Sequence, residues 1–116
     1  MHTHLKQFDT SALHQLRPEV SSVTQQLERM LSQYADDLES VAELADAQQI
    51  SAQLAKVMKL IELKGADLLL EEVTQGLKEL EDAAPQPMPQ LVLALSLAMM
   101  LFSRYMDFVL LKKIQM

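Results

Sequence analysis

A twelve-residue run at 91–102, LVLALSLAMMLF, contains Ser96 as its only polar side chain. Such a run has to be covered by a protein core, by a partner or by lipid. A helix that spans a bilayer needs about 20 predominantly apolar residues, and Arg104 and Asp107 follow before that length is reached. The run therefore predicts a helix in a soluble bundle or a partner interface, and a membrane anchor is the less favoured alternative.

Helical spacing divides this segment into a narrow polar seam and two apolar stripes. Ser96, Ser103 and Asp107 align on one face, and Arg104 is within reach of Asp107. One stripe consists of Leu91, Leu95, Met99, Phe102, Met106 and Val109, and the other consists of Leu93, Leu97, Met100, Leu101, Phe108 and Leu111. A helix with two apolar stripes needs neighbours on most sides, so we expect it to be the most enclosed helix of the fold.

Composition favours an all-α protein of one domain. The 116 residues include two glycines, two tyrosines, three phenylalanines and no tryptophan, which leaves few of the turn and aromatic residues that strands and hairpins use. Leu, Ala, Gln, Glu and Met dominate instead, and these residues lose little on entering a helix. A chain of this length with 49% apolar residues can bury a core of its own.

Charge and cysteine content narrow the classes of function. A formal net charge of −6 opposes the phosphate backbone of nucleic acids, which binds clustered Lys and Arg. With no cysteine the chain has no disulfide and no thiolate chemistry. The first residues, MHTHLKQFDTSALHQ, lack the apolar core of a secretory signal. We therefore expect a cytoplasmic protein without a nucleic-acid partner.

The N-terminal half predicts a tail followed by a long helix. Residues 1–17 are expected to be a flexible segment with at most a short helix, because Pro18 disfavours helical geometry at Arg17 and suits the first turn of a new helix. The helix near 18–37 carries one apolar stripe: Val20, Val23, Leu27, Met30 or Leu31, Tyr34 and Leu38. Residues 18–116 are expected to be one domain, which could be excised from a longer protein because a helical pattern continues to KKIQM.

Two further helices are expected in the middle of the chain. The segment SVAE from Ser40 to Glu43 has the form of a capping box, and Gly65 is suited to the positive φ that ends a helix. The apolar line between them is Leu44, Ala47, Ile50, Leu54, Val57 and Ile61. The next helix, near 66–82, is expected to bury Leu69, Val73, Leu77 and Leu80. Gly76 inside it marks either a close backbone approach or a tolerated weak spot.

Three prolines within AAPQPMPQ, residues 83–90, end that helix and form a stiff connector. Pro89 suits the first turn of the last helix. Four long helices with short links predict an antiparallel four-helix bundle.

Catalytic and metal-binding patterns are scarce. His2 and His4 could share a metal ion only from a tail, and two ligands make a weak site. His14 has no nucleophile motif nearby, and phosphate-loop, HExxH and GxSxG motifs are missing from the sequence. Neighbouring acids such as Glu71 and Glu72 point in different directions on a helix. The sequence therefore predicts no enzyme, no cofactor and no metal site.

The segment QLAKVMKLIELKGADLLLEEV, from Gln53 to Val73, resembles the central helix pair of histidine phosphotransfer domains. The sharpest part is LIELKGADLLLEEV at 60–73, where an apolar helix end, a turn glycine and an apolar-acidic helix start follow one another. The segment LFSRYMDFVLLKK at 101–113 is similar to the closing helix of the family. The resemblance is to the degenerate domains of ChpA-type chemosensory histidine kinases and FimL scaffolds, which belong to type IV pilus twitching-motility signalling. It implies a phosphotransfer-like bundle, whose parent chain could be a sensor histidine kinase.

The resemblance also implies where a phospho-accepting histidine would stand. Active domains carry an HxxKG motif, with the histidine exposed on the second helix about ten residues before the turn glycine. Counting back from Gly65 gives Ala55, and residues 15–116 contain no histidine. Phosphotransfer needs a ring nitrogen as nucleophile, so we expect a non-catalytic domain.

Around Ala55, helical spacing predicts a low, mildly basic surface. Its members are Ala52, Ala55, Lys56, Lys59 and Glu62. Such a surface could receive an acidic protein partner, such as a response-regulator receiver domain or a pilus or polar scaffold protein, although exposed lysines more often only keep a helix soluble. A partner could recruit the protein to the cell pole or the inner membrane.

Two rival interpretations remain open. One is an active phosphorelay domain of a hybrid histidine kinase, for which His14 is the one candidate acceptor. The other is a self-associating or membrane-peripheral helical adaptor that uses the spare apolar surface of the last helix.

Overall fold

Four helices make up the described part of the chain. The computed structural model describes the backbone of residues 10–115 and the side chains of residues 15–109. The helices are α2 (Thr10–Asp36), α3 (Val41–Leu60), α4 (Ala66–Ala83) and α5 (Pro89–Gln115), and the described residues contain no strand. This confirms the prediction of an all-α four-helix bundle.

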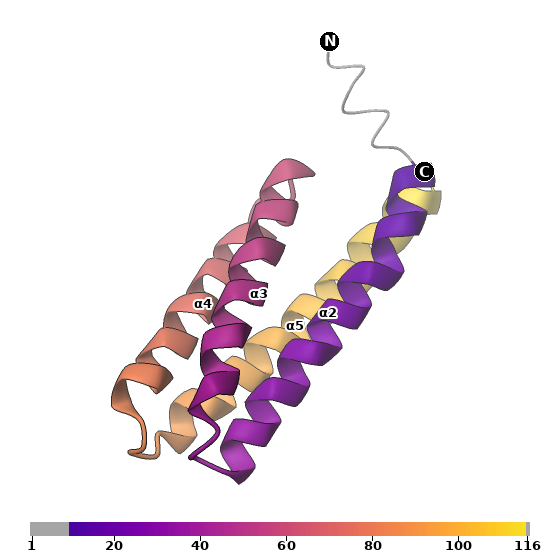
Figure 1. Ribbon diagram of the computed structural model, residues 1–116. Helices are drawn as coiled ribbons and strands as arrows, with labels where there is room; N and C mark the ends of the chain where they lie inside the picture. Colours follow the sequence, from indigo (N-terminus) through magenta and orange to yellow (C-terminus); the bar gives the residue numbers. More distant parts are fainter. Residues whose placement is uncertain (1–9, 116) are drawn as a thin grey trace.

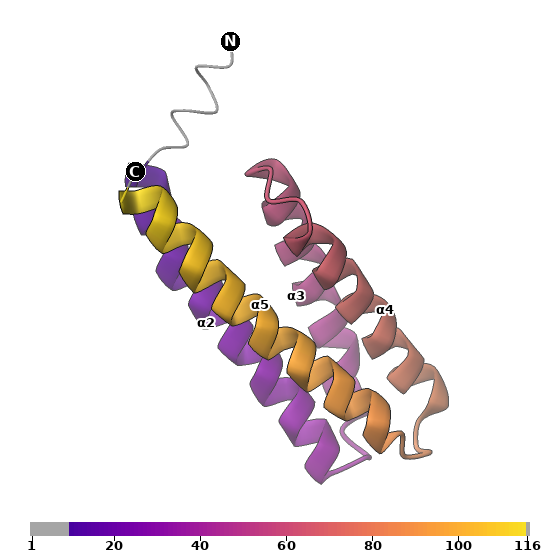
Figure 2. The ribbon, with the colours of Figure 1, turned by 180° about the vertical axis from the view of Figure 1, so that it is seen from behind.

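The helices lie side by side in the order of the chain. Each helix contacts its neighbours in sequence, and α5 closes the ring against α2. Figure 1 shows that the chain reverses direction at each of its three turns, and Figure 2 shows the pairs α2–α5 and α3–α4 from behind. The helix α3 therefore lies diagonally opposite α5 in the bundle. Each pair of neighbouring helices has its own outer surface.

Apolar stripes form the core largely as their spacing predicts. In α2 the predicted residues Val20, Leu27, Leu31 and Tyr34 are buried. In α3 and α4 the predicted core is joined by neighbours, because each helix contacts two others and buries a wider strip than a single line. The added buried residues are Ser51, Ala55, Met58, Ala66, Asp67, Leu70 and Gly76.

The predicted helix break at Pro18 is wrong. The helix α2 begins at Thr10 and includes Pro18 in its interior. An interior proline removes a backbone hydrogen bond and costs about 3 kcal/mol, so other contacts have to hold this turn. Leu16 packs against the core, and the Arg17 guanidinium lies 4.0 Å from the Asp107 carboxylate of α5. Asp107 therefore pairs with Arg17 of α2, whereas the sequence predicted a pair with Arg104.

The helix α5 is not the most enclosed helix, contrary to expectation. Its first apolar stripe supplies four buried residues, Leu95, Met99, Phe102 and Met106. The described residues of the second stripe are exposed. A four-helix bundle covers only the inward side of each helix, so the second stripe has no neighbour within the bundle.

The apolar length of α5 is also greater than expected. Apolar residues resume beyond Arg104 and Asp107, and by length and composition alone the 21 residues Pro89–Val109 could cross a membrane. Only 22% of this segment is buried. Length and composition are weak evidence for a span, because core helices of soluble proteins pass the same test.

The helix α3 differs from its prediction at both ends. Ser40 precedes α3, but its hydroxyl donates to Asp37 Oδ2 at 3.4 Å and makes no capping bond. The residue with positive φ after α3 is Glu62 (φ 61°), whose N–H donates to the Lys59 carbonyl at 3.1 Å. Gly65 (φ 97°) instead precedes α4. The glycine thus starts the third predicted helix and does not end the second.

We expect Glu62→Gly to raise the free energy of unfolding by about 1 kcal/mol, because a side chain in the left-handed region carries a penalty of that size. Urea denaturation measures the change. The control is Glu62→Ala, which keeps the Cβ atom and should give no comparable gain. Equal effects of the two substitutions would contradict this interpretation.

The Tyr34 hydroxyl is buried without a hydrogen-bond partner among the described residues. A buried, unpaired polar atom costs on the order of 1–3 kcal/mol. Tyr34→Phe is therefore expected to leave the midpoint of urea unfolding unchanged or to raise it. A loss of more than about 1 kcal/mol would show that the hydroxyl has a partner in solution.

Candidate functional site

A hollow of about 280 Å³ lies between α3 and α4 and contains most of the predicted surface. It is lined by Ala52, Ala55, Lys56, Lys59, Glu71 and Thr74. The first four residues come from the predicted surface on α3. Glu71 and Thr74 were not predicted, because they come from α4 and only the packing of α4 against α3 brings them here.

Ala55 forms the floor of this hollow and is only 4% exposed. The expectation of an exposed position halfway along the helix is therefore wrong for this residue. The methyl group belongs to the hydrophobic core, because α4 packs closely against the side of α3 that carries Ala55. A small residue allows this approach of the two helices.

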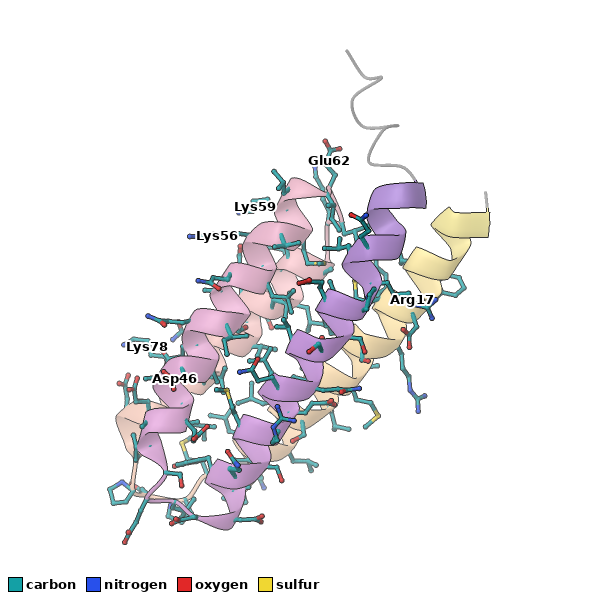
Figure 3. All side chains as sticks on the ribbon, turned by 45° about the vertical axis from the view of Figure 1, so that its right-hand side comes forward. Arg17, Asp46, Lys56, Lys59, Glu62 and Lys78 are labelled. Carbon is teal, nitrogen blue, oxygen red and sulfur yellow. The ribbon has the colours of Figure 1, made fainter. Side chains whose placement is uncertain are left out.

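Glu62 lies apart from the other residues of the predicted surface. The helix α3 ends at Leu60, and the chain turns at Glu62, so helical spacing no longer relates this residue to Lys59. Figure 3 shows Lys56 and Lys59 extending from the same side of α3 and Glu62 at the end of the hairpin. The hollow therefore loses one of its five predicted members.

The basic character of the hollow is weaker than predicted. Lys59 Nζ lies 3.5 Å from Glu71 Oε2, and both side chains are largely exposed. Lys56 has no carboxylate within 4 Å among the described residues. The hollow thus carries one net positive charge, located mainly at Lys56, and a solvent-exposed pair that an incoming charge can open at little cost.

Thr74 lines the inner wall of the hollow, and the buried Ser51 lies behind it. Ser51 Oγ donates to the Leu70 carbonyl oxygen at 3.1 Å, and Thr74 Oγ1 lies 2.7 Å from Ser51 Oγ. These bonds tie α3 to α4 one turn from Ala55. Among the described side chains, the hydrogen-bond partners of these two hydroxyls are each other and the Leu70 carbonyl oxygen.

The HxxKG motif offers a second register for the missing histidine. Lys64 and Gly65 match its last two residues, which places Ile61 at the histidine position. Ile61 is the C-cap of α3, and residues 61–65 form the turn between α3 and α4. Neither register provides an imidazole. The turn location also departs from the helical location that the resemblance implies.

The remaining candidate residues form no second reactive site in the described part of the chain. His2 and His4 lie outside the described residues. His14 falls within α2, but its side chain is not among those described. The described residues contain no cluster of three or more metal-binding side chains. Glu71 and Glu72 diverge as expected, because Glu71 lines the α3–α4 hollow and Glu72 faces α5.

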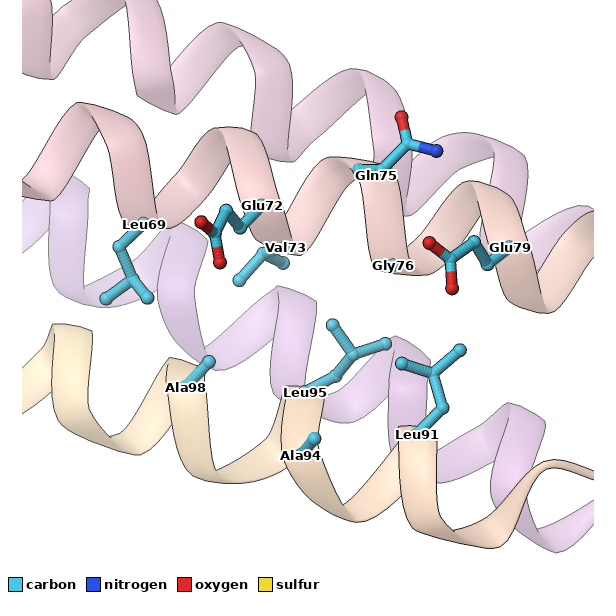
Figure 4. Close-up of a pocket in the computed structure, with 10 residues that line it drawn as sticks. All are labelled: Leu69, Glu72, Val73, Gln75, Gly76, Glu79, Leu91, Ala94, Leu95 and Ala98. Carbon is cyan, nitrogen blue, oxygen red and sulfur yellow. The ribbon is translucent and has the colours of Figure 1, made fainter.

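A second cavity, of about 320 Å³, lies between α4 and α5 (Figure 4). A Cβ atom at Gly76 would lie 2.6 Å from Leu95 Cδ2, so the glycine marks a close approach of α4 to α5. Glu72 and Glu79 line this cavity together with Ala94 and Ala98. Gln75 is the third polar residue of its wall, and the other lining residues are apolar or glycine.

We expect Ala55→His to destabilise the bundle by about 1–3 kcal/mol, because an imidazole does not fit beneath α4 without displacing it. Lys56→His is the matched control. That side chain is exposed, so its change should stay within about 0.5 kcal/mol. Urea denaturation of both variants measures the change in the free energy of unfolding. An Ala55→His variant as stable as the parent would contradict the burial of Ala55.

Comparisons of the chain with protein-family models, with curated proteins and with solved structures find no match.

Proposed function

We propose that this chain is a non-catalytic, phosphotransfer-like interaction domain that acts as a scaffold in type IV pilus chemosensory signalling. The residues at 60–73 and 101–113 support the signalling role by resemblance. The observation that carries the non-catalytic assignment is that neither register holds a histidine: Ala55 stands in the α3–α4 hollow, and Ile61 stands at the turn that follows α3. Because neither position offers a nitrogen that can accept a phosphoryl group, the function proposed for this surface is the binding of a protein partner.

The chemistry of the hollow fits an acidic side chain or a small acidic cluster on a protein partner. Lys56 is uncompensated, and the exposed Lys59 can exchange Glu71 for an incoming carboxylate. Thr74 offers a polar contact at the wall. A receiver domain, whose phosphorylation site is built from acidic residues, is the partner class that we favour. A pilus or polar scaffold protein with an acidic segment would use the same groups.

This proposal places the protein in the cytoplasm, with recruitment to the cell pole or the inner membrane through its partner. An active phosphorelay domain is the rival function. It requires a histidine acceptor, for which His14 is the one candidate between residues 10 and 115. The segment LHQLRP around it lacks the HxxKG pattern.

The test measures binding and phosphoryl transfer with the same purified receiver domain. We expect the receiver to bind in a salt-dependent manner and to transfer no acid-labile phosphate to the chain. The double variant Lys56→Glu/Lys59→Glu should weaken binding by roughly tenfold or more, because it reverses the charge of the hollow.

The control variant, Arg29→Glu/Lys78→Glu, makes the same change in net charge at exposed positions on α2 and α4 that do not line the hollow. It should bind as the parent does. Equal weakening by the two double variants would show a general charge effect and count against docking at the hollow. Stable acid-labile label on the chain would overturn the non-catalytic assignment.

A further inference from the structure

Six large apolar side chains in the described part of α5 are exposed, and the five between residues 93 and 105 lie together. These five form the α5 face: Leu93, Leu97, Met100, Leu101 and Tyr105. Each is 41–63% exposed, and all five recur at helical spacing on the side of α5 that points away from the core. The α5 face adjoins the α4–α5 cavity through Ala94 and Ala98, and Leu101 and Tyr105 also line a neighbouring cavity of about 340 Å³ against the α3–α4 turn.

The size of this apolar surface matches one half of a protein interface. Half-exposed side chains of these types leave on the order of 500 Å² uncovered, near the upper limit for the largest apolar patch of a monomer. One partner of a standard interface contributes about 800 Å², of which roughly 60% is apolar. The α5 face is therefore large enough to form a stable complex without further apolar contacts.

A bilayer is a poorer occupant than protein. Insertion of α5 across a membrane would remove Met99 and Phe102 from the core, where both are 1% exposed. Binding flat on a membrane surface would place Glu72 and Glu79, beside the face, against lipid headgroups. A chain of net charge −6 gains no attraction from anionic lipids.

Charge complementarity identifies a second copy of the chain as the occupant. Arg104 falls within the α5 face by helical spacing and has no carboxylate within 4 Å among the described residues. Glu79 lies at the rim of the α4–α5 cavity, and no ion pair of Glu79 occurs among those residues either. A charge inside an interface needs such a partner.

The geometry of an antiparallel pair brings these two charges together. Gly76 of α4 is level with Leu95 of α5, so Glu79, about one turn further along α4, is level with about residue 92. If two α5 helices cross antiparallel near residue 99, the middle of the face, Arg104 of one copy comes level with about residue 94 of the other, which is about 3 Å along the axis from the level of Glu79. Arg104 then faces Glu79 of the second copy, and symmetry repeats the pair.

We propose that two copies of this chain form a symmetric dimer in which the α5 faces pack antiparallel and Arg104 of each copy pairs with Glu79 of the other. The inference does not depend on the proposed signalling function. Since α3 is diagonal to α5, the dimer leaves both α3–α4 hollows open. A dimer thus presents two equivalent docking surfaces and can bind a paired partner with avidity.

Sedimentation equilibrium of the whole chain tests the dimer. We expect a mass of twice 13.1 kDa at concentrations of roughly 10–100 µM. Leu97→Glu and Leu101→Glu should each weaken the dimer at least about 100-fold, because they bury a charge without a partner. Leu60→Glu is the matched control, since Leu60 is at least as exposed as Leu97 and Leu101 but lies at the end of α3. Circular dichroism verifies that each variant is folded.

A charge swap tests the orientation of the two copies. Arg104→Glu and Glu79→Arg should each weaken the dimer about tenfold, and the double variant should recover most of the loss. No recovery would overturn the antiparallel pairing.

Three other results would overturn the dimer proposal. One is a monomer at 100 µM, and another is a dimer that Leu97→Glu leaves as intact as Leu60→Glu does. The third is a chain that is monomeric in solution but sediments with vesicles of phosphatidylcholine and phosphatidylglycerol through the α5 face, which would identify the bilayer as the occupant.

Discussion

The structure depends on the packing of one apolar stripe of α5 against the core of the bundle. Leu95, Met99, Phe102 and Met106 enter the core between α2 and α4, and this fixes the rotation of α5 about its axis. This rotation directs the polar seam towards α2, where Asp107 forms an ion pair with Arg17. Arg17 belongs to α2, which continues through Pro18 as one helix. The rotation of α5 also leaves the second apolar stripe facing outward, so the most apolar segment of the chain supplies both core and surface.

The α3–α4 pair has a different organisation, because its contact is polar as well as apolar. Ser51, Thr74 and the Leu70 carbonyl are linked by hydrogen bonds beside Ala55, and Lys59 meets Glu71 at the surface. These contacts hold the two helices close together and still leave a hollow with one uncompensated amine. The bundle thus has two unlike surfaces, a small basic hollow and a broad apolar face. Their separation allows each to serve a different partner.

Much of the fold could be predicted because helix formation and stripe burial are local properties. The apolar period of residues 20–34 and the start of α5 at Pro89 needed no knowledge of neighbours. The errors occurred where distant contacts compete with local preference. Pro18 lies inside a helix that also contacts α5, and Glu62 takes the left-handed conformation that was assigned to Gly65, whose own positive φ serves the start of α4. Local rules rank such residues correctly on average but do not include the energy of long-range packing.

In the candidate site, too, some properties follow from the local sequence and others depend on long-range packing. The sequence by itself determined that no histidine is present from residue 15 onward, that Lys56 and Lys59 share one side of a helix, and that the last helix carries two apolar stripes. Only the tertiary structure decided that Ala55 is buried, that Glu71 neutralises Lys59, and which stripe of α5 remains exposed. The physical reason is that periodicity fixes which residues share a face, whereas burial and pairing depend on which other helix covers that face.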